Sequence, residues 1–73
     1  MISLKEFVSA MKPDTRLLVD DSSKVGGAVE TTTGAMWFEL VTTGSDFVVE
    51  HITPHEDHVV VTVSPMEQER SQR

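Results

Sequence analysis

Three histidines and two acids fall within the eight residues HITPHEDH, from His51 to His58. Imidazole and carboxylate groups bind zinc or nickel, so His51 and His58 could hold a metal together with an acid such as Glu56. The spacing matches no standard metal motif, however, and the stretch offers no evident group to orient the imidazoles. The sequence therefore favours an exposed polar turn, with no metal or other cofactor, over a metal site.

Two pairs of adjacent acids are the other groups that could do chemistry: Asp20 with Asp21, and Glu56 with Asp57. General acid–base catalysis needs a pocket around the carboxylate. Adjacent residues on a strand point to opposite faces, and those in a turn are usually solvated. No serine lies in a nucleophile motif, cysteine is absent, and so small a chain hardly encloses a substrate. We therefore expect no enzymatic activity.

The charge of the chain is strongly one-sided. Twelve acids against six bases give a formal net charge of -6, and Lys24 is the only base between Arg16 and Arg70. Such a body repels phosphate backbones, so direct nucleic-acid binding is not expected. It suits a host protein or nucleoprotein complex with a basic surface, although acidity also serves simply to keep a protein soluble. The acidic candidates for partner contact are Asp20, Asp21, Glu50, Glu56 and Asp57.

The absence of cysteine and the hydropathy of the sequence indicate in which cellular compartment the protein is expected. Small secreted domains commonly rely on disulfides, and this chain has no cysteine. The first residues lack the apolar run of a signal peptide, and no stretch approaches the ~18 apolar residues of a membrane span. We therefore expect a cytoplasmic protein that does not contact a membrane.

The N-terminal residues predict a short amphipathic helix over residues 4–12. Ser3 and Glu6 have the spacing of a capping box, and Pro13 disfavours helix at the residue before it. A helix of nine residues is not stable alone in water, so its apolar stripe must dock on a sheet. That stripe consists of Leu4, Phe7, Val8 and Met11.

Two strands are expected next. Residues 15–19 (TRLLV) are continuously apolar at their centre, which is typical of a buried strand. Residues 20–23 (DDSS) predict a turn, and residues 24–30 (KVGGAVE) a second strand. Within that strand Gly26 and Gly27 indicate a bulge or a close backbone approach. A phosphate-binding loop would need further glycines, a lysine and a following helix at set spacing, which are absent.

Residues 31–43 (TTTGAMWFELVTT) fit two structures. A strand would place Met36 and Phe38 on one face and Trp37 on the other. A short helix would begin at Thr32 or Thr33 and would bury Met36 and Leu40. We prefer the helix, and we expect the indole of Trp37 in the core, because a small domain needs bulky apolar groups. If the indole is exposed instead, Met36 and Trp37 become candidate contact residues.

The C-terminal part predicts a hairpin. Residues 46–53 (DFVVEHIT) and 58–63 (HVVVTV) form its arms, and residues 54–57 (PHED) join them. In the first arm strict alternation would place Phe47, Val49 and His51 on one face. Residues 1–65 would then form a single domain, and the polar residues 66–73 a flexible tail.

The expected fold class is α+β, with an N-terminal amphipathic helix packed on a mainly antiparallel sheet of about four strands and a second short helix as an option. The expected core consists of Leu4, Phe7, Val8, Met11, Leu17, Val19, Phe47, Val49, Val59, Val61 and Val63.

The two ends of the chain resemble one group of proteins. The opening SLKEFVSAMKPDTRLLVDD and the closing VVEHITPHEDHVVVTV resemble small uncharacterised proteins encoded by phages and prophages, which have a capped helix, a Pro-Asp-Thr turn into a strand and a terminal valine-rich hairpin. That group has no agreed catalytic residues, so the resemblance assigns none. It implies a phage origin, a compact α+β fold, and action on a component of the host bacterial cytosol.

Three functions remain open at this point. The favoured one is a non-enzymatic inhibitor that occupies a basic surface of a host macromolecule, as anti-CRISPR and other anti-defence proteins do. The second is an oligomeric sponge for a small ligand or signalling nucleotide, against which the acidity counts. The third is a phage accessory or assembly protein that self-associates, for instance as a homodimer.

Overall fold

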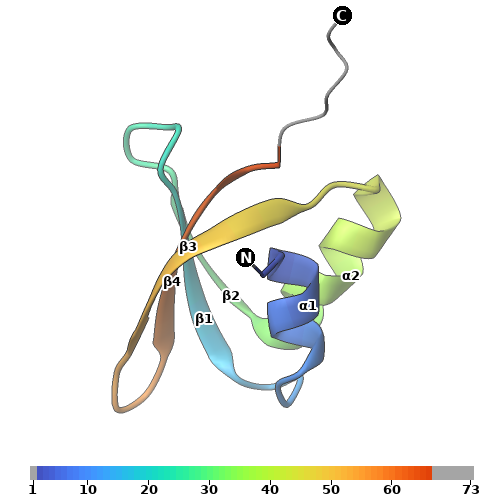
Figure 1. Ribbon diagram of the computed structural model, residues 1–73. Helices are drawn as coiled ribbons and strands as arrows, with labels where there is room; N and C mark the ends of the chain where they lie inside the picture. Colours follow the sequence, from blue (N-terminus) through green and yellow to red (C-terminus); the bar gives the residue numbers. More distant parts are fainter. Residues whose placement is uncertain (1, 67–73) are drawn as a thin grey trace, which may run out of the picture.

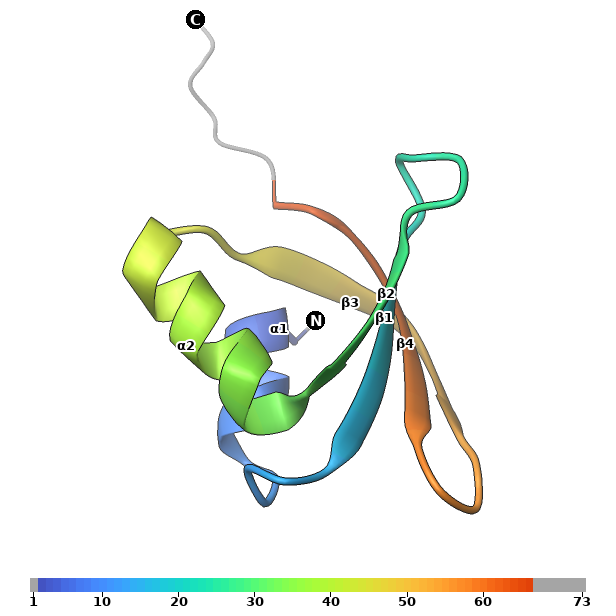
Figure 2. The ribbon, with the colours of Figure 1, turned by 180° about the vertical axis from the view of Figure 1, so that it is seen from behind.

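A computed structural model describes residues 2–66 of the chain. Its elements are α1 (Leu4–Ser9), β1 (Arg16–Asp21), β2 (Ala28–Thr32), α2 (Thr33–Thr43), β3 (Phe47–Pro54) and β4 (Val59–Pro65). The strands form one sheet, and both helices lie on the same side of it (Figure 1). The view from behind shows the same layering, with the opposite face of the sheet uncovered (Figure 2). The expected α+β fold is confirmed.

The strand order in the sheet is β2-β1-β4-β3. The two outer pairings, β1 with β2 and β3 with β4, are antiparallel, whereas the central pairing of β1 with β4 is parallel. The sheet is therefore mixed, with antiparallel pairs in the majority. Because β2 and β3 lie at opposite edges, α2 carries the chain across the whole sheet between them.

The capping box at the start of α1 is present as expected. The Ser3 hydroxyl accepts from the Glu6 amide at 3.1 Å, and the Ser3 amide donates to the Glu6 carboxylate at 3.3 Å. The helix ends at Ser9, not at residue 12 as expected. The Ala10 amide still bonds the Phe7 carbonyl, and the chain then turns because Pro13 disfavours helix before it.

The boundaries of β1 and β2 differ from the expectation. Asp20 and Asp21 belong to β1, because the parallel pairing extends to Asp21 opposite Val63. The turn occupies residues 22–27 instead of 20–23, so Gly26 and Gly27 lie in it and not in a strand. Gly26 has a φ of 68°, which favours glycine at this position.

Residues 33–43 are helical, as preferred from the sequence. The Thr32 hydroxyl caps α2 by accepting from the Ala35 amide at 3.2 Å, and Gly44 ends it in the left-handed conformation. The start of α2 is held against the end of the α1 segment. The Gly34 amide donates to the Pro13 carbonyl at 2.9 Å, and the buried Thr33 hydroxyl donates to the Lys12 carbonyl.

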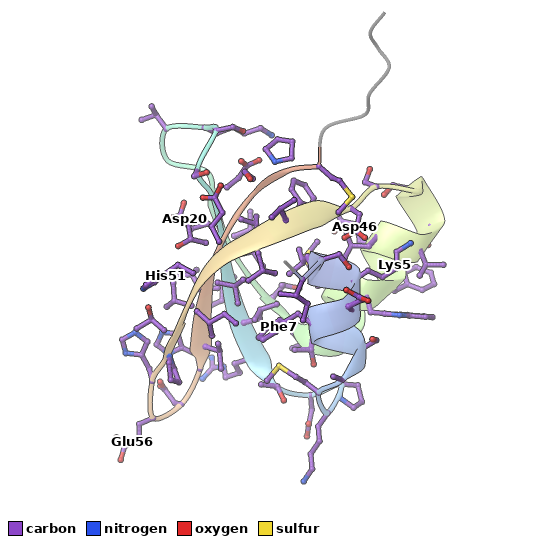
Figure 3. All side chains as sticks on the ribbon, in the orientation of Figure 1. Lys5, Phe7, Asp20, Asp46, His51 and Glu56 are labelled. Carbon is purple, nitrogen blue, oxygen red and sulfur yellow. The ribbon has the colours of Figure 1, made fainter. Side chains whose placement is uncertain are left out.

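The core lies between the helices and the covered face of the sheet. Its buried side chains are Leu4, Val8, Leu17, Val19, Leu40, Val61 and Val63. Phe7, which Figure 3 shows projecting from α1 toward the sheet, packs on these together with Met36, Phe47, Val49 and Val59. Met11 was expected in this core but instead lies at the edge of a surface hollow, because α1 ends before reaching it. The expected tail lies outside the described residues, apart from Met66.

The first arm of the hairpin contains a β-bulge that strict alternation does not predict. Val49 pairs with Val63, but the next pair joins His51 to Thr62, and Ile52 then lies opposite Val61. The extra residue shifts the alternation by one position. His51 consequently lies on the uncovered face of the sheet, and the expectation that it shares a face with Phe47 and Val49 is wrong.

Candidate macromolecular interface on the uncovered face of the sheet

The uncovered face has an apolar centre. Leu18 of β1 and Val60 of β4 are direct neighbours in the parallel pairing, and both are half-buried without any helix above them. In the same row Glu30 of β2 flanks Leu18 and Thr53 of β3 flanks Val60. An apolar centre with polar residues at both edges is the arrangement found in protein interfaces.

Carboxylates surround this centre. The next row of the face runs from Ala28 through Asp20 and Thr62 to His51. Figure 3 shows Asp20 and His51 both pointing away from the helices. Glu50, the bulged residue, accepts a hydrogen bond from the Ser22 hydroxyl at 3.4 Å, which ties it to the end of β1.

The hairpin turn adds a further carboxylate at the opposite end of the face. The Asp57 carboxylate lies 2.7 Å from Nδ1 of His58, and a surface hollow of about 310 Å³ separates them from Arg16, Leu18 and Glu30. The hydrogen bond from His58 is the main cause that lowers the pKa of Asp57, followed by the bond from its own amide. Asp57 is therefore charged at neutral pH.

Arg16 is the one base on this face among the described residues. Its guanidinium lies 3.7 Å from the Glu30 carboxylate, and both side chains are well exposed. Exposed pairs of this kind are weak. Four carboxylates therefore face one guanidinium, and the uncovered face is acidic: Asp20, Glu30, Glu50 and Asp57 against Arg16.

The two aspartates of β1 have separate environments. Asp20 lies on the uncovered face, whereas Asp21 points to the helix side and is only 9% exposed. Asp21 accepts bonds from the Ser23 hydroxyl at 2.6 Å and from the Ser23 amide at 2.9 Å. These bonds lower the pKa of Asp21. Asp21 therefore shapes the turn after β1 and does not share a surface with Asp20.

The histidines do not assemble as a His51–His58 pair. His51 pairs with Thr62, whereas His58 precedes Val59 at the far end of β4. His58 instead stacks on His55, with ring centroids 4.7 Å apart, because the His55 amide bonds the His58 carbonyl across the turn. Within residues 2–66 no three histidine or acidic side chains come close enough to hold a metal ion.

The remaining candidates lie elsewhere. Glu56 is at the exposed tip of the hairpin turn (Figure 3). Met36 packs on the core, and Trp37 of α2 is 42% exposed, so the expectation of a buried indole is wrong. The α2 residues are on the other side of the sheet from the acidic face. The sequence alone did not identify Glu30, Leu18 and Val60 as parts of one face, because that requires the strand order.

Comparison with protein families, with curated proteins and with solved structures finds no match. Neither helix in the described part of the chain has the length and apolarity needed to cross a membrane.

Proposed function

We propose that the chain is a small acidic binding protein without catalytic activity, and that its uncovered sheet face docks on a basic surface of a host macromolecule. The observation that carries this proposal is the placement of four carboxylates around the half-buried pair Leu18 and Val60. Carboxylates at the rim supply attraction and orientation toward a basic partner, and the apolar centre supplies area that loses water on contact.

The class of partner follows from charge and from the resemblance of the two chain ends to phage proteins. A basic groove that binds nucleic acid has the complementary charge. Occupying such a groove would block nucleic acid from entering it, which is the mode of action of an anti-CRISPR or other anti-defence inhibitor. We therefore propose a host nucleic-acid-handling protein in the bacterial cytosol as the target.

The first test is a pull-down from a bacterial lysate with the tagged chain, performed at low and at moderate salt and read by mass spectrometry. We expect one basic nucleic-acid-handling complex to be enriched, and to be lost as salt rises, because screening weakens attraction between exposed charges. Enrichment of no protein at either salt would count against the proposal.

Charge reversal locates the contact. The variant carries Asp20→Lys and Glu50→Lys on the acidic face. The matched control is Glu39→Lys, an exposed acid of α2 on the other side of the sheet. Each exposed ion pair is worth about 0.2–1 kcal/mol, and reversal adds repulsion, so the double variant should bind the captured partner roughly tenfold more weakly or worse. Equal affinity of the double variant and the control would show that this face is not the contact.

A further inference from the structure

A hollow of about 250 Å³ lies on the helix side of the sheet, between α2 and the turn that joins β1 to β2. The charged residues that line it are Asp21, Glu30 and Glu39 against Lys24. The apolar part of its wall comes from α2 and from all four strands: Val19, Val29, Met36, Phe47 and Val63. An apolar hollow with a few charged groups is typical of a small-molecule site, and the excess of carboxylates favours a cation.

Asp21 is the charged group of this hollow that is withdrawn from water, since it is only 9% exposed. The Ser23 hydroxyl and the Ser23 amide both donate to the same carboxylate oxygen, Oδ1. No residue between 2 and 66 donates to the other oxygen, Oδ2. A buried carboxylate oxygen without a donor costs free energy, and such groups are normally satisfied by a ligand, an ion or water. The hollow therefore contains an acceptor that is available to a ligand.

We propose that this hollow binds a small aliphatic amine, whose ammonium group donates to Oδ2 of Asp21 and whose alkyl chain packs on the apolar wall. An ammonium is a compact cation that needs only one acceptor oxygen, whereas a guanidinium binds a carboxylate best when it contacts both oxygens. Because Ser23 occupies Oδ1, the site favours the ammonium.

The carboxylate is prepared for such a ligand in charge and in position. The bonds from Ser23 lower the pKa of Asp21, so it is ionised at neutral pH, where an alkylamine is protonated as lysine is. The same bonds fix the side chain before the ligand arrives. Little conformational entropy is then lost on binding, which favours affinity.

The other charged residues of the hollow adjust the strength of binding. Glu39 adds a second carboxylate from α2, but it is exposed and therefore attracts the ammonium less. Glu30 is already paired with Arg16. Lys24 opposes the ligand because it has the same charge. It does not replace the ligand, since its charge is the smallest of the causes that affect the pKa of Asp21.

The test is an NMR titration of the isotope-labelled full chain with butylammonium chloride at neutral pH, in which the amine salt replaces sodium chloride at constant ionic strength. We expect saturable shifts of the amide signals of Ser23, Met36 and Glu39. Butanol has the same apolar chain without the charge, so it should bind about tenfold more weakly or worse. Butylguanidinium should also bind more weakly than butylammonium.

Four variants locate the ammonium. Asp21→Asn removes the charge and should weaken binding about tenfold or more. Its matched control is Asp20→Asn, the neighbouring acid on the opposite face of β1, which should bind the amine as the parent does. Glu39→Gln and Lys24→Gln change exposed side chains and do not endanger the fold. Glu39→Gln should weaken binding by about two- to fivefold, and Lys24→Gln should strengthen it.

Three results would overturn the proposal. The first is the absence of saturable shifts when butylammonium has replaced all of the sodium, which would assign Oδ2 to water. The second is equal binding of butanol, and the third is equal binding by Asp21→Asn and Asp20→Asn. If Asp21→Asn does not fold, unchanged binding by both Glu39→Gln and Lys24→Gln would refute the site. The proposal does not rest on the proposed function, because Asp21 is absent from the acidic sheet face and amine binding is measured without any protein partner.

Discussion

Gly34 is the residue at which helix propensity and packing make opposite predictions for a substitution by alanine. Alanine is about 1 kcal/mol more favourable than glycine inside a helix, so propensity predicts that Gly34→Ala stabilises the protein. In the structure, an added Cβ would lie 2.9 Å from both the Cβ and the carbonyl oxygen of Pro13. Ordinary contact begins at 3.4 Å, so the overlap is half an ångström on two atoms.

Relieving this overlap is costly because a hydrogen bond joins the start of α2 to Pro13 at the same place. The Gly34 amide donates to the Pro13 carbonyl at 2.9 Å, so moving α2 away stretches that bond. Overpacking typically costs about 1–3 kcal/mol, which exceeds the gain from propensity. We expect Gly34→Ala to lower the free energy of unfolding by about 1 kcal/mol, which corresponds to a fall in Tm of roughly 4–8 °C for a domain of this size.

Thermal unfolding followed by circular dichroism measures this effect. The matched control is Ala35→Gly at the next, exposed position, which loses helix propensity but meets no neighbour. If Gly34→Ala raised the Tm by about as much as Ala35→Gly lowers it, the close approach of α2 to Pro13 would be refuted.

Two further predictions concern stability. Leu40→Ala removes most of a side chain that is 1% exposed. It should lower the free energy of unfolding by about 2–5 kcal/mol, a large part of a total of roughly 4–11 kcal/mol. Urea unfolding measures this loss; Val41→Ala, at an exposed position of α2, should lower the free energy far less, and equal losses would contradict the described core. The Ser23 bonds lower the pKa of Asp21, so they stabilise the fold above the unfolded value of 3.8, and this contribution is lost as pH falls through the folded pKa. Ser23→Ala should therefore have a lower free energy of unfolding than the parent at neutral pH, and this difference should become smaller below about pH 4. A difference that does not change with pH would show that the Ser23 hydroxyl does not stabilise the fold through the charge of Asp21.

Local signals in the sequence were sufficient for the elements they control. The Ser3–Glu6 cap, the Thr32 cap and the hairpin turn each depend on residues that are near neighbours in the sequence. The turn occupies residues 55–58 and not 54–57 as expected, because Pro54 belongs to β3 and pairs with Val59. These features could be predicted because the hydrogen bonds that make them join near neighbours.

Features that depend on distant pairing could not be predicted. The parallel pairing of β1 with β4 extends β1 through Asp21 and buries that carboxylate on the helix side. The bulge at Glu50 reverses the faces of the residues after it, which moves His51 to the acidic face. Both effects follow from which strand lies next to which, and that order is not encoded in any short stretch. The sequence therefore predicted that the candidate interface is acidic, but not which residues form it.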